Sequence, residues 1–324
     1  MNSEPEAGAE IGKIAYNRFL LLVAFATARH IKMIPEIEMP GHAVAAIAAY
    51  PEFGNSDIPD YHPAVRTLGG VQPYTFSPSE KTFQFLGDVV EEVCALFPDA
   101  PYFHIGGYEA PKEQWSQSAA AQKAMRENGL KDANELQSWF IRRIEKLVNA
   151  HGKKLIGWDE IQEGGLSPTA TMMVWRDRKW ATLAINHGND VVMTPLEITC
   201  LCYPEGPSPE LPGFKNWGRF IPMDKAYNFD PVPPDLTPDQ RRHVLGTEAN
   251  LWSEYIYNQA KLEYVAFLRL CALAEVAWSP AGIRSLPDFL SRLESHESRL
   301  NELKVNYRKP DGSPARTECQ IVNE

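Results

Sequence analysis

Carboxyl groups, imidazoles and indole rings gather where predicted β-strands end and loops begin. The residues at these positions are Glu36, Glu38, His42, His104, Glu109, Trp158, Asp159, Trp175, Trp252 and Glu254. A carboxyl group can donate or accept a proton during a reaction, and the flat apolar face of an indole stacks on flat apolar partners such as sugar rings. This combination of acids and tryptophans favours acid–base chemistry on a carbohydrate.

Predicted helices and short β-rich segments alternate along the chain. Apolar spacing predicts helices over residues 14–29, 81–97, 134–151, 180–187, 262–278 and 286–303, and strands over 31–34, 102–105, 154–156, 171–174, 190–193 and 244–246. Alternating βα units imply an α/β fold with a parallel sheet, either a barrel or a doubly wound sheet. In a parallel barrel the residues after the strand ends form the active site. The proline-dense segment 203–238 is expected to be a lid or rim.

The composition is that of a folded globular chain. Its 324 residues suit about two average domains or one α/β barrel with extensions. Hydrophobic residues make up 44% and charged residues 23%, which excludes disordered, collagen-like and coiled-coil chains. The net charge of −10, without long basic runs, disfavours nucleic acid as a partner.

Targeting signals are not recognisable in the sequence. The longest apolar run, residues 19–26, is too short to cross a bilayer, so no membrane partner is expected. The first ten residues are acidic, whereas a signal peptide begins with basic residues. Localisation therefore stays open.

Several enzyme classes lack their signatures here. The GxSxG nucleophile turn, the P-loop and the GxGxxG turn are absent from the sequence, which disfavours serine hydrolases, P-loop NTPases and dinucleotide enzymes. His42 and His104 are too few for a metal site, and no cofactor is expected. A barrel hydrolase with a second catalytic carboxylate, supplied by Asp159 or Glu160, stays open.

The cysteines do not suggest a disulfide framework or a zinc site. There are five, an odd number without CxxC spacing: Cys94, Cys200, Cys202, Cys271 and Cys319. Reduced thiols are the expectation.

Four ordered motifs resemble one enzyme family. Residues 34–42 (IPEIEMPGH), 103–109 (FHIGGYE), 156–160 (IGWDE) and 249–254 (ANLWSE) resemble the catalytic domain of family 20 glycoside hydrolases, the β-N-acetylhexosaminidases, and so do residues 272–279 (ALAEVAWS). The resemblance runs from about residue 14 onward and implies a TIM (β/α)8-type barrel, of which this chain would hold about six of the eight strands.

The resemblance also implies a reaction. Family members remove terminal β-linked N-acetylglucosamine or N-acetylgalactosamine from oligosaccharides or glycoconjugates with retention of configuration. The nucleophile is the carbonyl oxygen of the substrate's own 2-acetamido group, an exception to the scheme with two catalytic carboxylates. Glu109 matches the general acid.

Other matched positions imply contacts with the sugar. Trp158, Trp175 and Trp252 match an aromatic box around the acetamido methyl group and the ring, and Glu254 matches the acid that binds sugar hydroxyls. For His42 and His104, a direct role and a supporting, hydrogen-bonded role both stay open.

Substitutions at three positions set this chain apart from its relatives. Tyr108 stands where the family has an Asp that orients the acetamide and stabilises the oxazolinium, and we expect a rate loss of about 10²–10³ by analogy with removing one preorganised electrostatic group. Cys200 and Cys202 align with a Tyr and an Asp of the family, although Tyr203 next to them could serve instead. A thiol is a weak hydrogen-bond donor, so clamping of the acetamide is expected to be impaired.

The last expected difference from the relatives lies at the N-terminus of the chain. Relatives have two further barrel strands there, so we expect residues 1–13 to be a polar tail and residues 14–324 to be an N-terminally incomplete barrel. Six strands would leave two exposed edges. The chain could be a fragment, be completed by a missing segment or a homo-oligomer, or form an open barrel. The alternative function is that of a catalytically inactive sugar-binding relative or a truncated product.

Overall fold

The computed structural model describes residues 4–67, 69–207, 218–309 and 312–316. The chain divides into two compact units, residues 1–171 and 172–324, and each is described by itself. The single barrel domain expected over residues 14–324 stays a prediction.

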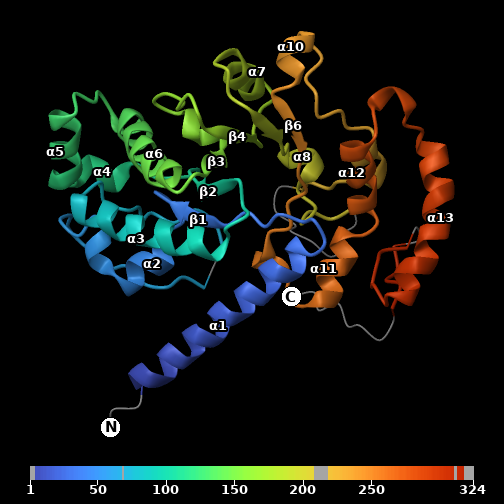
Figure 1. Cartoon of the computed structure of the whole chain (residues 1–324), viewed down its shortest axis with the longest axis horizontal. Coiled ribbons are helices and arrows are strands. Elements are labelled where there is room, and N and C mark those ends of the chain that lie inside the picture. Colours follow the sequence, from blue (N-terminus) through green and yellow to red (C-terminus); the bar gives the residue numbers. More distant parts are fainter. Residues whose placement is uncertain (1–3, 68, 208–217, 310–311, 317–324) are drawn as a thin grey trace. The chain divides into compact units, whose positions relative to one another are not determined.

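The first unit is built on three parallel strands in chain order, β1 (Glu36–Met39), β2 (Tyr102–Gly106) and β3 (Lys154–Trp158). Helix α6 (Ala133–Ala150) packs on β3 and on α3 (Glu80–Leu96), as Figure 1 shows. The remaining helices of the unit are α1 (Glu4–Thr27), α2 (Val44–Ala49), α4 (Glu113–Gln117) and α5 (Ala119–Glu127), with 3₁₀ turns at Pro51–Phe53 and Asp159–Gln162.

The sequence of α6 explains both its start and its packing. Asp132 caps the helix, because its carboxylate accepts hydrogen bonds from the backbone N–H groups of Asn134 and Glu135 at 2.8 and 2.9 Å. Leu136, Phe140, Ile144 and Val148 follow at four-residue spacing and are all fully buried. This apolar stripe fixes which face of α6 covers the sheet.

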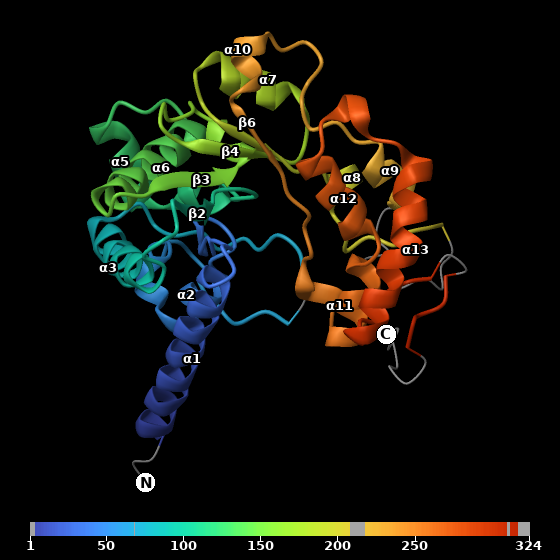
Figure 2. The same ribbon diagram turned by 45° about the vertical axis from the view of Figure 1, so that its right-hand side comes forward.

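The second unit contains β4 (Thr171–Val174) apart from its first residue, β5 (Val191–Met193) and β6 (Val244–Thr247), again parallel and in chain order. Its helices are α7 (Lys179–Asn186), α8 (Leu196–Thr199), α9 (Met223–Tyr227), α10 (Pro238–Arg241), α11 (Gln259–Ala266), α12 (Arg269–Trp278) and α13 (Leu286–Glu302), with 3₁₀ turns at Ser253–Tyr255 and Ala281–Ile283. Figure 2 shows α12 running beside α13.

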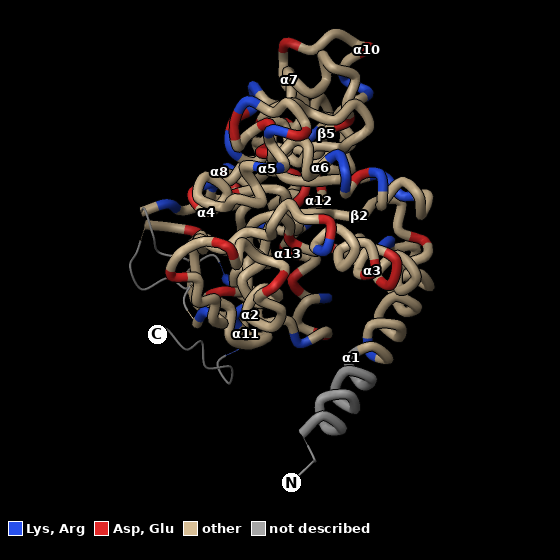
Figure 3. Tube along the Cα trace, turned by 90° about the vertical axis from the view of Figure 1, so that its left-hand side faces the viewer, with Lys and Arg blue, Asp and Glu red and all other residues tan. Residues whose placement is uncertain are grey.

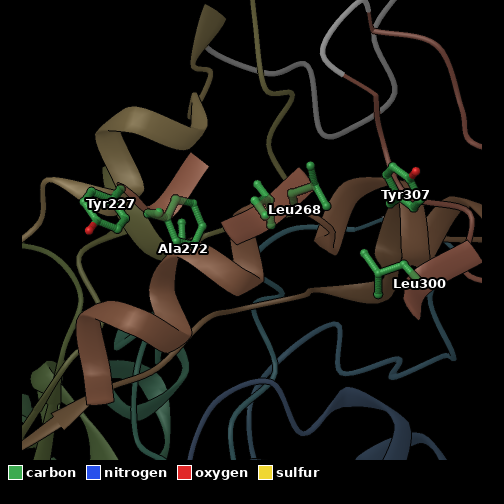
Figure 4. Packing of buried hydrophobic residues seen from close by; sticks show 7 residues of the cluster. Tyr227, Leu268, Ala272, Leu300 and Tyr307 are labelled. Atoms are coloured by element: carbon green, nitrogen blue, oxygen red, sulfur yellow. The ribbon is translucent and has the colours of Figure 1, made fainter. Parts of the chain in front are cut away.

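An apolar cluster joins the C-terminal helices of the second unit. Figure 4 shows side chains from α9, α12, α13 and the segment after α13 packed together. The cluster consists of Tyr227, Leu268, Ala272, Phe289, Leu293, Leu300 and Tyr307. Burying these side chains away from water is what holds the four segments to one another.

Three boundaries differ from those the sequence predicts. The strand expected at residues 31–34 is wrong: pairing with β2 starts only at Pro35, whose carbonyl accepts the His104 N–H at 2.9 Å, and β1 is Glu36–Met39. Helix α1 begins at Glu4, so residues 4–13, expected as a polar tail, are helical. The helix expected over residues 262–278 is two helices, because Phe267 has extended backbone and ends α11. The other predicted strands and helices are confirmed within about two residues.

Charged residues are mixed along the fold. Figure 3 shows Lys and Arg interspersed with Asp and Glu over the described helices and loops. Within the described residues, no helix is both long and apolar enough to span a membrane.

Candidate active site

Glu109 lies in a strained turn directly after β2. Its backbone φ is +45°, a left-handed conformation that is unfavourable for a residue with a Cβ atom, and Gly106 and Gly107 before it have φ values of +65° and +79°. Strain of this kind persists only where the surrounding structure imposes it, and it is concentrated at functional sites. The turn thus sets the direction of one acidic side chain.

The glycine at the end of β2 leaves room for a second acid. A Cβ atom on Gly106 would lie 1.7 Å from Oε2 of Glu38, so no residue with a side chain fits without displacing that carboxyl group. Glu38 comes from β1, the neighbouring parallel strand. The glycine therefore allows the carboxyl groups of Glu38 and Glu109 to share one end of the sheet.

His42 and Tyr108 flank the Glu109 carboxylate. Nε2 of His42 lies 3.1 Å from Oε2 of Glu109, and both side chains are partly exposed. The imidazole of His42 faces the phenol of Tyr108 at 4.5 Å between ring centroids, and that phenol lies 5.7 Å from the indole of Trp158. Four of the residues predicted from the sequence are thus assembled in one place.

Glu36 links the buried side chains of Trp158 and His104. The indole N–H of Trp158 donates to Oε1 of Glu36 at 2.9 Å, and Nδ1 of His104 lies 3.0 Å from the same oxygen. The backbone N–H of Gly106 also points at Nδ1 of His104, at 3.0 Å. His104 is 5% exposed and Trp158 is 3% exposed. His104 therefore helps to fix the orientation of Trp158, because both side chains contact the same oxygen of Glu36 and their ring centroids lie 5.2 Å apart.

The pKa values of the two acids of β1, Glu36 and Glu38, are shifted in opposite directions. Burial, followed by the negative charge of Glu36 and a hydrogen bond to it, raises the pKa of Glu38 to about 9. Burial also acts to raise the pKa of Glu36, but hydrogen bonding and charge from His104 and the N–H of Trp158 outweigh it, so that pKa is lowered. At neutral pH the pair therefore carries one proton, on Glu38, and one negative charge, on Glu36.

In the second unit, Trp175 lines a cavity of about 830 Å³. Tyr203 lines it too, whereas Cys200 and Cys202 do not; the two thiols are buried in a small cluster with Tyr203, Ile221, Leu196 and Trp252. Four charged residues of the cavity were not anticipated from the sequence: Arg176, Glu197, Arg219 and Lys225. Arg219 and Lys225 lie within the segment expected as a lid or rim, and residues 208–217 of that segment lie outside the described residues.

Of the remaining acids, Glu254 does not line the cavity of the second unit, and Asp159 and Glu160 are buried. Glu254 is exposed in the 3₁₀ turn Ser253–Tyr255 that follows Trp252 in the chain. Asp159 and Glu160, the acids considered as a second catalytic carboxylate, are 0% and 5% exposed. Among the described residues, no group of three or more His, Cys, Asp or Glu side chains is arranged to hold a metal ion.

Similar proteins place the chain in a family. Residues 6–281 match the model of the glycosyl hydrolase family 20 catalytic domain. A β-hexosaminidase of Porphyromonas gingivalis is 43% identical over 292 residues, and one of Vibrio furnissii is 36% identical over 259; these matches cover 89% and 78% of this chain but only 37% and 41% of those proteins. The chain thus spans less than half the length of either relative.

A solved structure agrees with the sequence matches. An exo-β-N-acetylglucosaminidase of Vibrio harveyi in complex with N-acetylglucosamine superposes with a TM-score of 0.80 at 36% identity, covering 91% of this chain and 46% of that one. The six parallel strands and their helices thus correspond to part of a TIM-barrel-type α/β fold. From the family match and these relatives together, we conclude that the chain belongs to glycosyl hydrolase family 20.

Proposed function

We propose that this chain carries the catalytic machinery of a β-N-acetylhexosaminidase, which removes terminal β-linked N-acetylglucosamine or N-acetylgalactosamine from an oligosaccharide or glycoconjugate. One observation carries the proposal: the Glu109 carboxylate, set by the left-handed turn after β2, lies 3.1 Å from Nε2 of His42. This places a hydrogen-bonded acid at the strand end where a barrel holds its catalytic groups.

Glu109 is the proposed general acid and base. In the first step its carboxyl proton passes to the glycosidic oxygen while the carbonyl oxygen of the substrate's acetamide attacks the anomeric carbon, so that the bond to the leaving group breaks and a cyclic oxazolinium forms. In the second step the Glu109 carboxylate takes a proton from water, the water oxygen attacks the same carbon, and the acetamide is restored. His42 keeps the carboxyl group oriented through both steps.

Tyr108 is proposed to weaken the first step. Its phenol oxygen can accept a hydrogen bond from the acetamide N–H, but it brings no negative charge to the developing oxazolinium. Its ring also occupies the space between the imidazole of His42 and the indole of Trp158. We therefore expect slow turnover, about 10²–10³ below that of a site with Asp at this position.

The tryptophans are proposed to contact the sugar. Trp158 is suited to form a fixed wall because Glu36 binds its indole N–H, and we give Trp175 and Trp252 of the second unit the same stacking role. Glu254 is proposed to bind sugar hydroxyl groups. The sequence resemblance aligns Cys200 and Cys202 with substrate-clamping positions, yet Tyr203, which lines the cavity, is the better candidate to donate a hydrogen bond to the acetamide.

The test is hydrolysis of a chromogenic β-N-acetylglucosaminide by the chain, by Tyr108→Asp and by Glu109→Gln, each checked for folding by circular dichroism. We expect slow release of the chromophore by the chain, faster release by Tyr108→Asp, and loss of activity in Glu109→Gln. Turnover that survives in Glu109→Gln would contradict the role given to Glu109.

A second candidate function rests on the presence of Tyr108 where the family has an Asp. With Tyr108 beside the acid and thiols at two binding positions, the site could retain a sugar without cleaving it. Calorimetric titration with N-acetylglucosamine separates the two: binding without hydrolysis by any of the three proteins supports a sugar-binding relative, and absence of binding by folded protein contradicts both functions.

A further inference from the structure

Cys200 and Cys202 bring two sulfur atoms together beside the cavity. Their Sγ atoms are 2.7 Å apart, and the two residues are 2% and 6% exposed. A tight turn produces this proximity, because the carbonyl of Cys200 accepts the backbone N–H of Tyr203 at 3.1 Å. The sulfur atoms are thus within reach of one another through a small rotation of their side chains.

A buried arginine fixes the backbone of this turn. Arg269, on α12, is 1% exposed, and its guanidinium donates to the carbonyls of Leu201 and Tyr203 at 2.7 and 2.9 Å. It also donates to the carbonyl of Ile221 at 3.0 Å. The turn is therefore held at two carbonyls and tied to the neighbouring Ile221 segment, and the charge of Arg269 acts on both sulfur atoms.

The surroundings make the two thiols unequal. A hydrogen bond from the Cys200 thiol, a backbone hydrogen bond from Trp252 and the charge of Arg269 lower the pKa of Cys202 against the opposing effect of burial. The same hydrogen bond, with burial, raises the pKa of Cys200. Because the thiolate is the nucleophile, Cys202 is the sulfur that reacts first and Cys200 the one that follows.

We propose that Cys200 and Cys202 form a reversible dithiol–disulfide pair that is oxidised by hydroperoxides. The Cys202 thiolate attacks one peroxide oxygen, the O–O bond breaks, and Cys202 becomes a sulfenic acid while the first water leaves. The Cys200 sulfur then attacks the Cys202 sulfur, an S–S bond forms, and the second water leaves with the Cys200 proton. The two thiols lose two electrons and two protons together, and hydrogen peroxide takes them up as two waters.

A small oxidant can approach from the cavity. Leu196, Tyr203 and Ile221 pack against the sulfur pair and also line the cavity of about 830 Å³. These three side chains therefore contact both the cavity and the cluster that holds the thiols. The proposal does not depend on sugar hydrolysis, since its readout is the state of the sulfur atoms.

Two other cysteines provide controls. Cys94, on α3, is buried, and burial raises the pKa of its thiol. Burial raises the pKa of Cys271, on α12, to about 11. Both thiols are therefore expected to be poor nucleophiles, and Cys94→Ser and Cys271→Ser are matched variants that should leave oxidation of the pair unchanged.

The test is a thiol map of the full chain. The reduced protein is treated with equimolar hydrogen peroxide, unfolded in N-ethylmaleimide, digested and analysed by mass spectrometry. We expect an internal disulfide in the peptide that carries Cys200 and Cys202, at least about tenfold faster than oxidation of Cys94, and complete reversal by dithiothreitol. Alkylation of both thiols at the same yield as Cys94, or a disulfide from either of them to Cys319, would overturn the proposal.

Single variants test the order of the two steps. In Cys200→Ser the reaction should stop at the Cys202 sulfenic acid, which dimedone traps, whereas Cys202→Ser should leave Cys200 reduced. Sulfenic acid on Cys200 in the Cys202→Ser variant at the rate seen for Cys202 would contradict the assigned order. Because the thiol map uses the unmodified chain, the proposal stays open to refutation even where a variant fails to fold.

Discussion

Replacing Glu38 with Gln should stabilise the first unit at neutral pH. In the folded chain burial and the charge of Glu36 raise the pKa of Glu38 to about 9, against 4.5 for an ordinary Glu. Folding at neutral pH therefore requires this carboxylate to take up a proton, which opposes folding. Gln has nearly the same shape, can donate its N–H to Glu36, and needs no proton.

The size and sign of the effect follow from the two pKa values. Because the folded-state pKa is raised, the stability that the Glu38 proton supports is fully present below about pH 4.5 and is lost as the pH rises through about 9. Each pH unit in this window contributes about 1.4 kcal/mol, which gives an upper bound of about 3 kcal/mol at neutral pH. Glu38 is only half-buried, so water screens its neighbours and we expect a gain of about 1–2 kcal/mol.

Urea unfolding of parent and variant, followed by tryptophan fluorescence at several pH values, measures this difference. The two proteins should have equal free energies of unfolding near about pH 4.5, and Glu38→Gln should gain progressively up to about pH 8. Glu92→Gln, which removes an exposed carboxylate from α3, is the matched control and should show no such trend. A Glu38→Gln protein that is less stable than the parent at neutral pH, or that differs from it by the same amount at every pH, would show that Glu38 takes up no proton on folding.

Three further predictions concern the framework of the fold. Asp132→Ala should lower the free energy of unfolding by about 1 kcal/mol, because two N–H groups of α6 lose their cap; an unchanged urea midpoint would show that the cap contributes nothing. Phe140→Ala should cost about 3–5 kcal/mol, because this fully buried side chain would leave a cavity under α6; a loss below about 1 kcal/mol would mean that the site collapses around the smaller residue. Arg269→Met should cost about 3 kcal/mol by leaving buried carbonyls without donors, and calorimetric melting at the parent's temperature would be inconsistent with that role.

Most of the fold could be predicted because each element depends on local pattern. The four-residue spacing of buried residues in α6, with Asp132 before it, predicts that helix to within one residue. The strand predicted at residues 31–34 fails for a reason that is not local. Three of those four residues are apolar, yet ladder pairing depends on the position of His104 in β2, and it begins only at Pro35.

The candidate site could be predicted in composition but only partly in arrangement. Glu109, His42 and Tyr108 follow from motifs at strand ends, and the parallel sheet brings them together. The hydrogen bond between Glu36 and Trp158 joins residues 122 positions apart, and no spacing in the sequence predicts it. The basic residues Arg219 and Lys225 lie in the proline-dense segment 203–238, Lys225 on the short helix α9, and neither period nor motif there indicates that they line a cavity.

The central claim is that the substrate's own acetamide, and not a protein carboxylate, serves as nucleophile while Glu109 supplies the proton. The most direct measurement compares hydrolysis of a 4-nitrophenyl β-N-acetylglucosaminide with that of the matching β-glucoside, which lacks the acetamide, by the chain and by Tyr108→Asp. We expect the glucoside to react at least about 10³-fold more slowly with both proteins, because it has no internal nucleophile. Equal rates on the two substrates would contradict it and would point instead to a carboxylate such as Asp159 or Glu160 as the nucleophile.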